Sequence, residues 1–353
     1  ADIDPAQTDD DIPSKLFNVV TYTGNGSTQS ISNLGFKPDL VWIKKRNGTT
    51  DHKLTDSSRG VTKSLKSDAG NNVGAESTDT NGLTAFGSDG FTVGSDAAYN
   101  NSSDTYVAWC WRANGGTTTS FSSSGNQLAG TYQANTKSKF SIITYTGSGS
   151  TGEVLHGMSA TPNFILSKDR GVNYGWNVFH KSNGTVNSGY DGQVYLNSNN
   201  DLATNQQVQV VPDSTKISMA GNEQINKSGT TYVMYAWADV EGYQKFGTYT
   251  ANANDDGPFI YTGFRPKMLF VKNLDENSTE WEVRDTAVNT FNPANKGIYW
   301  DQTQAEATRS EKYDILSNGF KIRKADGPAN FGSGSTIIFG AWADVPFKYN
   351  NTF

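Results

Sequence analysis

The run TYVAWCW at residues 105–111 recurs as TYVMYAW at residues 231–237 and as TIIFGAW at residues 336–342. Each run follows a stretch of small polar residues, and the last two continue as Ala-Asp-Val. Apolar side chains occupy both alternating sets of positions, which favours a β-strand buried on both faces in the middle of a sheet. The repetition predicts three copies of one β-rich module of about a hundred residues.

Other anchors precede each run in the same order. A Tyr-Thr dipeptide opens each copy, at residues 22–23, 145–146 and 249–250. A proline follows, and six residues later an apolar run ends in a lysine, at Lys44, Lys168 and Lys272. A weaker block comes next, at residues 52–56, 176–180 and 281–285. One matching tripeptide can arise by chance, but several anchors in a fixed order indicate repetition of a module.

The anchors divide the chain into five parts. We predict an acidic N-terminal arm and attachment segment at residues 1–14, modules at residues 15–113, 138–240 and 241–353, and a linker at residues 114–137. The linker is predicted from its content of Gly, Ser and Thr, which is typical of connecting segments.

Strand signals dominate inside each module. Only residues 303–312 (TQAEATRSEK) could form a short helix, and no long amphipathic helix is indicated. About six to eight short strands separated by turns are typical of a sandwich. We therefore predict an all-β fold made of three tandem β-sandwich modules of the jelly-roll or concanavalin-like type.

Composition excludes several classes of protein. The chain has 353 residues and 42 aromatic side chains (18 Phe, 16 Tyr and 8 Trp), enough to build packed cores. Its formal charge of −6 and the lack of a basic run argue against nucleic-acid binding. No apolar stretch is long enough to predict membrane insertion, and the acidic start is unlike a secretory signal. The single Cys110, in an aromatic run, predicts a buried inert thiol and a reducing cytoplasm.

Catalytic chemistry has little support in the sequence. The three histidines, His52, His156 and His180, lack metal-ligand spacing, and no serine lies in a nucleophile elbow. A pair of carboxylates for glycoside hydrolysis is conceivable, yet no acidic position recurs in all three copies; Asp56 and Asp285 recur in two. We predict no catalytic residue, no metal and no cofactor.

The recurrent lysines Lys44, Lys168 and Lys272 are the sharpest polar signal, and they have two interpretations. The first places each ammonium group at the surface, paired with a carboxylate such as Asp56 or Asp285. The second makes the lysines ligand contacts or crosslinking groups. A second kind of candidate ligand contact is a loop aromatic residue, and we name Tyr99 and Tyr174 because such rings could stack on a glycan.

Three stretches of the chain, at residues 22–47, 83–96 and 104–113, resemble a repeated module of virion structural proteins of tailed phages, especially marine and cyanobacterial ones. The stretch AWADVPFKYNN at residues 341–351 resembles the end of such proteins. The likeness is strongest in the first copy. It implies a component of the virion, on the head surface or in a fibre or appendage, and it implies no catalytic residue.

Our leading hypothesis is a non-enzymatic virion protein that is assembled in the host cytoplasm and exposed on the particle, as a capsid decoration or a fibre component. Its partners would be other virion proteins, bound through residues 1–14, and further copies of itself in a homo-oligomer. One alternative is a carbohydrate-binding adhesin that recognises a host-surface glycan. A further alternative is a polysaccharide depolymerase with one active module.

Overall fold

A computed structural model describes residues 12–68, 74–172, 174–182, 193–203 and 210–344. Antiparallel strands make up nearly all of the regular structure, so the all-β prediction is confirmed. The helices of the described residues are short: η2 (Pro13–Lys15), α1 (Ala97–Asn100) and α2 (Glu223–Asn226). The first residues of the predicted arm, 1–11, lie outside the described residues.

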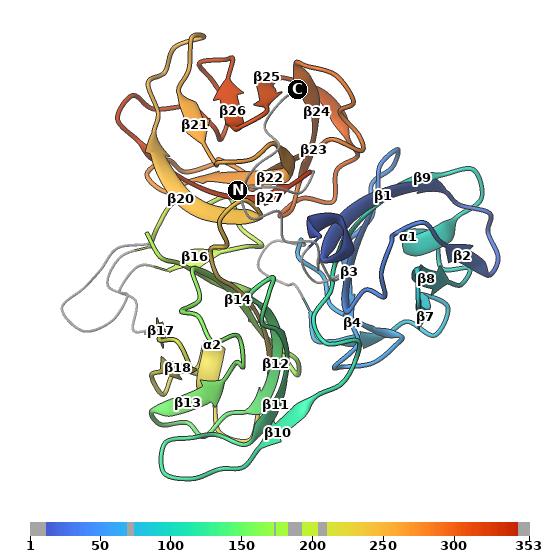
Figure 1. Ribbon diagram of the computed structural model, residues 1–353, viewed down its shortest axis with the longest axis vertical. Coiled ribbons are helices and arrows are strands. Elements are labelled where there is room, and N and C mark those ends of the chain that lie inside the picture. The colour runs from blue at the N-terminus through green and yellow to red at the C-terminus, as the bar shows by residue number, and fades with distance from the viewer. Residues whose placement is uncertain (1–11, 69–73, 173, 183–192, 204–209, 345–353) are drawn as a thin grey trace, which may run out of the picture.

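The chain forms three lobes, which Figure 1 shows in blue, green and orange around a common centre. We call them lobe 1 (residues 12–113), lobe 2 (residues 114–240) and lobe 3 (residues 241–344). Each lobe has a main sheet with the same arrangement of four strands: an opening strand, the closing strand, the lysine-bearing strand and a short fourth strand.

The four strands have these bounds in each lobe. In lobe 1 they are β1 (Phe17–Thr23), β9 (Thr105–Trp111), β3 (Leu40–Lys45) and β4 (Lys53–Asp56). In lobe 2 they are β12 (Phe140–Thr146), β19 (Thr231–Trp237), β14 (Phe164–Asp169) and β15 (Asn177–His180). In lobe 3 they are β20 (Gln244–Thr250), β27 (Thr336–Ala343), β22 (Pro266–Asn273) and β23 (Glu282–Asp285).

The register is also shared. The last tryptophan of each closing strand lies opposite the start of the opening strand, in the pairs Phe17–Trp111, Phe140–Trp237 and Gln244–Trp342. The closing strand therefore lies between two other strands in every lobe, as its two apolar faces predicted.

Smaller strands complete the lobes. Lobe 1 adds a sheet of β2 (Gln29–Ile31), β8 (Gly90–Val93) and β7 (Leu83–Gly87), with a hairpin of β5 (Lys63–Ser64) and β6 (Ser77–Thr78). Lobe 2 adds a sheet of β13 (Gly152–Leu155), β18 (Lys216–Met219) and β17 (Val210–Pro212), and its main sheet gains β16 (Val194–Tyr195). In lobe 3 the main sheet continues through β24 (Ala294–Tyr299), β25 (Ala307–Leu316) and β26 (Gly319–Ile322) to β21 (Phe259–Tyr261).

Two local predictions are corrected. Residues 114–137 are not a free linker, because β10 (Thr119–Phe121) and β11 (Gly130–Asn135) extend the main sheet of lobe 2 by pairing beside β12. The segment predicted as a short helix, residues 303–312, instead enters strand β25. There the alternation of half-buried and exposed side chains, together with pairing to β24 and β26, overrides the helix-forming composition.

The lysine-bearing strands show why the main sheets are apolar on both faces. In β3, Val41 and Ile43 point into a core that belongs to lobe 1, whereas Leu40 and Trp42 point into a core shared by all lobes. Strands β14 and β22 divide their side chains in the same way. Each main sheet is thus sandwiched between a local core and a central core. Cys110 lies in the local core of lobe 1, where burial raises the pKa of its thiol.

The central core contains all eight tryptophans of the chain, each fully buried. The closing tryptophans Trp111, Trp237 and Trp342 form a triangle at its middle. Their ring centroids lie 5.8, 5.5 and 6.0 Å apart, and all three pairs meet edge to face. Aromatic pairs in this geometry stabilise a core beyond their buried area. The lobes are therefore packed around one centre rather than strung along the chain.

Candidate functional site

The three recurrent lysines are fully buried. Lys44 Nζ donates to the main-chain oxygens of Lys45, Gly48 and Thr303, at 2.9, 3.3 and 3.1 Å. Lys168 Nζ donates to the main-chain oxygens of Asp169 and Val172, at 2.5 and 3.0 Å. Lys272 Nζ donates to the main-chain oxygens of Thr279 and Asn199, at 2.6 and 3.4 Å.

Through these contacts each lysine holds the main chain of nearby loops in place. Burial lowers the pKa of each lysine to about 8. The interpretation as surface ammonium groups paired with Asp56 or Asp285 is wrong, because the lysines bind carbonyls and those two aspartates have other partners. The buried ammonium groups also present no exposed cation to a ligand, so we assign the lysines a structural role.

A repeated contact joins the lobes in a ring. His52, Trp176 and Trp281 occupy the same place, directly before β4, β15 and β23. A ring nitrogen of each binds a main-chain oxygen of another lobe: His52 Nε2 to Tyr299 at 3.0 Å, Trp176 Nε1 to Lys66 at 2.6 Å, and Trp281 Nε1 to Tyr195 at 2.9 Å. Lobe 1 thereby contacts lobe 3, lobe 3 contacts lobe 2, and lobe 2 contacts lobe 1.

The same three residues are also fixed inside their own lobes. The side-chain oxygens of Asp68, Asn197 and Asp301 accept hydrogen bonds from the main-chain N–H groups of His52, Trp176 and Trp281, at 3.0, 2.7 and 3.1 Å. In each lobe the acceptor lies two residues after the residue whose main-chain oxygen binds the ring nitrogen of another lobe. The pairs are Lys66 and Asp68, Tyr195 and Asn197, and Tyr299 and Asp301. Each junction is therefore built from one motif that repeats three times.

The recurrent acidic position also lies at a junction. Tyr235 of lobe 2 donates its hydroxyl to Asp56 of lobe 1 at 2.7 Å. Trp109 of lobe 1 donates its ring N–H to Asp285 of lobe 3 at 3.2 Å. His180, which replaces the acid in lobe 2, binds the main-chain oxygen of Phe339 in lobe 3 at 3.3 Å. All three positions connect lobes, and the carboxylates of Asp56 and Asp285 accept hydrogen bonds across these junctions.

His52 must be neutral at its junction. Trp42 Nε1 can only donate, and it donates to His52 Nδ1 at 2.9 Å, so the proton of the neutral ring is on Nε2 and is donated to Tyr299. Burial, aided by the charge of Lys44, lowers the pKa of His52 well below its usual value. Protonation of His52 Nδ1 would place its N–H group against the N–H group of Trp42 Nε1.

This arrangement gives a pH prediction for His52→Gln. The pKa of His52 is lower in the folded protein than in the unfolded chain, where it is about 6.5. The contribution of the neutral ring to the free energy of unfolding is therefore complete above pH 6.5, and below it falls by about 1.4 kcal/mol per pH unit. Glutamine does not titrate, so the stability gap between wild type and His52→Gln should narrow by about 2 kcal/mol between pH 7 and pH 5. Urea unfolding at the two pH values measures the gap. A gap that does not change would contradict a neutral, buried imidazole.

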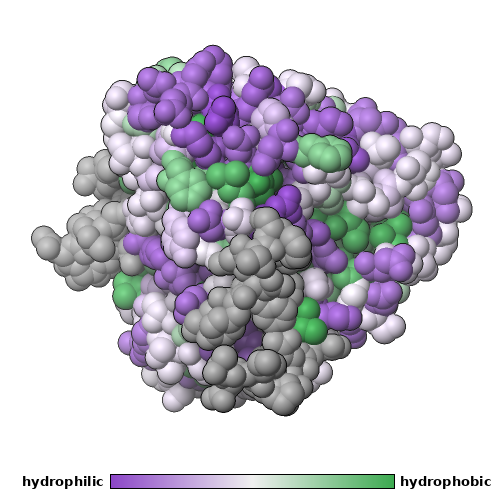
Figure 2. Space-filling model, turned by 45° about the horizontal axis from the view of Figure 1, so that its top comes forward, coloured by the Kyte–Doolittle hydropathy of each residue, from purple (hydrophilic) through white to green (hydrophobic). Residues whose placement is uncertain are grey.

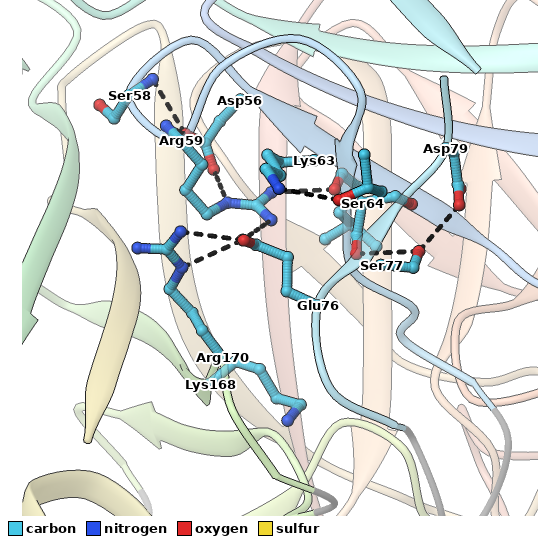
Figure 3. Close-up of polar contacts among 12 residues, drawn as sticks. Asp56, Ser58, Arg59, Lys63, Ser64, Glu76, Ser77, Asp79, Lys168 and Arg170 are labelled. Carbon is cyan, nitrogen blue, oxygen red and sulfur yellow. Dashed lines mark hydrogen bonds and ion pairs between the residues drawn. The ribbon is translucent and has the colours of Figure 1, made fainter. Parts of the chain in front are cut away.

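A second type of junction joins lobes 1 and 2 through charge. Figure 3 shows Arg59 and Arg170 converging on Glu76. Arg59 is fully buried and binds Asp56 Oδ2 at 2.5 Å and Glu76 Oε2 at 3.0 Å, and it donates to the Tyr235 hydroxyl at 3.0 Å. Arg170, from lobe 2, binds both Glu76 oxygens at 3.0 and 2.9 Å. Burial alone would raise the pKa of Glu76, but the two arginines outweigh it and lower that pKa.

Tyr99 is not an exposed loop residue. It lies in α1, whose N-terminus is capped by Asp96, and its ring is fully buried. The hydroxyl donates to Asp79 Oδ2 at 3.1 Å, and Gly82 leaves space for the ring, because a Cβ there would lie 2.8 Å from it. The prediction of Tyr99 as a glycan contact is therefore wrong.

Tyr174, in contrast, lines a pocket on lobe 2. The pocket has a volume of about 250 Å³ and is lined by Tyr174, Gly175, Tyr195, Asn197, Ser198, Asn200 and Gln224. Side chains from the loop before β15, from β16 and its following loop, and from α2 meet there. Tyr195 and Gln224 were not predicted from the sequence. The structure thus places one of the five candidate ligand residues at an open site.

A second pocket, of about 370 Å³, lies at the boundary of lobes 2 and 3, along the seam between β20 and β21, the two edge strands of the lobe 3 sheet. Lys245 Nζ crosses this seam to the main-chain oxygen of Tyr261 at 2.8 Å. Asp239 on its wall is already paired with Lys181 at 2.5 Å. The Lys245 contact joins β20 to β21 across the seam, whereas the Asp239–Lys181 pair lies within lobe 2.

The coloured part of the face in Figure 2 is mainly hydrophilic or neutral. Figure 2 shows hydrophobic residues on the visible face as small separate patches among hydrophilic and neutral ones. Within the described ranges, no cluster of three or more His, Cys, Asp or Glu side chains is placed to hold a metal ion. No helix of the described residues is long and apolar enough to cross a bilayer.

One protein-family model matches the chain over residues 12–346, and its description is "Domain of unknown function (DUF7483)". No curated protein and no solved structure matches the chain.

Proposed function

We propose that this chain, which belongs to the DUF7483 family of domains of unknown function, is a non-enzymatic structural protein exposed on the surface of a tailed-phage particle. The observation that carries the proposal is the closed ring of contacts among the lobes. The polar groups that recur along the chain, at Lys44, His52 and Asp56 and their counterparts, are used to connect loops and lobes. Such a design suits a rigid building block.

We further propose that the lobes are three tandem copies of one sandwich module of about a hundred residues. The shared strand order, the shared register and the thrice-repeated junction support this origin. A duplicated module that closes on itself gives a compact knob. This shape favours a decoration of the capsid or the tip of an appendage over a long stalk.

The likeness of residues 22–47, 83–96 and 104–113 to virion proteins supplies the particle context. These stretches include the lysine-bearing and closing strands of lobe 1, which build both the local and the central core. The recurrent carboxylates Asp56 and Asp285 are engaged at junctions, which weighs against the depolymerase alternative.

Localisation in purified particles tests the proposal. Gold-labelled antibodies against the chain should mark the surface of phage particles whose genome encodes it, and deletion of the gene should remove both the label and a visible surface feature. Mass spectrometry of the same particles should find the chain at a fixed copy number. Particles that never contain the chain would overturn the proposal.

Truncation of residues 1–11 tests the predicted attachment arm. Thermal unfolding of the truncated chain is the control that checks whether it still folds before its incorporation is measured. If the arm attaches the protein to the virion, the truncated chain should be absent from particles assembled in the deletion strain. Incorporation at the wild-type copy number would contradict the role of the arm in attachment.

A further inference from the structure

We propose that the pocket on lobe 2 binds one unit of a neutral saccharide. The proposal goes beyond a structural role in the particle, and it stands or falls separately from it. It rests on the shape of the pocket, on the way its side chains are held, and on the difference between lobe 2 and the other lobes.

The shape of the pocket depends on Gly175, one of its lining residues. A Cβ at this position would lie 2.8 Å from Asn197 Oδ1 and 2.8 Å from Tyr195 Cδ1, so a larger residue would force those two side chains to move. Tyr174 and Tyr195 are the two aromatic residues that line the pocket. A hollow of about 250 Å³ with two tyrosines is suited to a single sugar ring, whose C–H faces pack against aromatic surfaces.

Hydrogen bonds among the lining residues and to their neighbours hold the side chains of the pocket in place. The Tyr174 hydroxyl donates to Glu223 Oε2 at 2.6 Å, and the Tyr195 hydroxyl donates to Gln224 Oε1 at 2.9 Å. Gln193 Nε2 donates to the same Gln224 oxygen at 2.6 Å. The Gln224 carbonyl is thus doubly occupied, and no described residue accepts a hydrogen bond from its amide nitrogen. Side chains fixed before binding lose little conformational freedom when a ligand arrives.

The chemistry of the lining selects an uncharged, hydroxyl-rich ligand. Its side chains carry phenol, amide and hydroxyl groups, which both donate and accept hydrogen bonds as sugar hydroxyls do. Among the described residues that line the pocket there is no lysine, arginine, aspartate or glutamate, so none of them compensates a charge on the ligand. Glu223 lies beside it and is paired with Lys227 at 3.7 Å, so this neighbouring pair supplies no net charge that would attract an ion.

Two side chains of the pocket, those of Tyr174 and Gln224, are not repeated at the matching positions of the other lobes. Tyr174 precedes Trp176 by two residues, and the matching positions before His52 and Trp281 are Thr50 and Thr279. Gln224 precedes Asn226 by two residues, and the matching residue in lobe 1 is Ala98, two before Asn100. Asn100 and Asn226 are equivalent because they make the same hydrogen bond. The side-chain oxygen of each accepts from a main-chain N–H of the loop after the opening strand, at 2.9 and 2.8 Å. The scaffold therefore does not require Tyr174 or Gln224.

Binding of free sugars by the full chain tests the proposal. Saturation-transfer difference NMR would be recorded with glucose, galactose, mannose and N-acetylglucosamine, and with N-acetylneuraminic acid as a charged counterpart. At least one neutral sugar should receive saturation. Transfer to none of the four, or to the charged sugar alone, would overturn the proposal.

Two variants then locate the site. Tyr174→Thr introduces the residue that both other lobes carry at this position, so it should keep the wild-type thermal midpoint. Gln224→Ala introduces the residue of lobe 1 but removes the oxygen that accepts hydrogen bonds from Tyr195 and Gln193, so its midpoint should fall, and its sugar binding is recorded well below that midpoint. Each should weaken sugar binding by about tenfold or more, the factor expected when about 1.4 kcal/mol of contact is lost. Tyr261→Thr is the matched control, because it removes a tyrosine that is 59% exposed on lobe 3, and it should bind as wild type does. Binding within twofold of wild type in both lobe 2 variants would overturn the assignment.

Discussion

Replacing Trp237 with alanine is expected to destabilise the whole protein, by about 3–5 kcal/mol, the range for truncating a buried aromatic residue. Trp237 is fully buried in the central core, where it contacts Trp111 of lobe 1 and Trp342 of lobe 3 at centroid distances of 5.8 and 6.0 Å. It also stacks on Phe140 and meets Phe164 within lobe 2. The cavity would therefore open where all three lobes meet.

Urea unfolding and amide hydrogen exchange measure this effect together. Protection should fall in strands β9 and β27 as well as in β19, because the three closing strands share the triangle of tryptophans. Phe291→Ala serves as the control: it removes an aromatic ring that is 85% exposed, so its cost should stay within about 0.5 kcal/mol. A loss of protection confined to lobe 2 in Trp237→Ala would show that the lobes have separate cores.

Replacing Arg59 with leucine is expected to cost about 3–5 kcal/mol, because removing one partner leaves a buried charge uncompensated. Arg59 has no exposed side-chain area and compensates Asp56, which is equally buried, and it also binds Glu76. Its guanidinium also donates to the main-chain oxygen of Leu54 at 2.9 Å. Leucine fills part of the volume but leaves the Asp56 carboxylate without its cation.

Arg170→Leu is the matched control for this second prediction. Arg170 binds the same Glu76, but its side chain is 24% exposed and water can replace it, so the loss should be about 1 kcal/mol or less. Thermal or urea unfolding of the two variants compares them directly. Equal losses would contradict the view that Arg59 is the buried hub and Arg170 a peripheral partner.

Local features of the fold were predictable from the sequence. The closing runs have apolar side chains at both alternating sets of positions, and β9, β19 and β27 are central strands. The abundance of aromatic residues predicted packed cores, and every tryptophan is buried. These features depend on side-chain periodicity, which a single sequence records directly.

The way the lobes associate was not predictable in the same manner. A strand with two apolar faces fits a sheet packed between two layers, whether the second layer comes from the same module or from others. Nothing in the run TYVAWCW specifies that Trp111 meets Trp237 and Trp342. The partners lie more than a hundred residues away, and no local pattern encodes them.

The candidate residues illustrate the same limit. Lys44 ends an apolar strand, a pattern shared by surface and buried lysines, and one of the carbonyls that binds it is that of Thr303 in another lobe. Tyr99 looked like a loop residue because α1 is only four residues long. Tyr174 had one usable signal: it replaces a threonine that both other copies carry.

The junctions and the shared core should make the three lobes one cooperative unit. Scanning calorimetry of the intact chain tests this most directly. We expect a single transition whose calorimetric enthalpy equals its van't Hoff enthalpy, because no lobe keeps its main sheet buried once the central core opens. Two or three resolved transitions, or a calorimetric enthalpy well above the van't Hoff value, would show that the lobes unfold independently and would contradict the account.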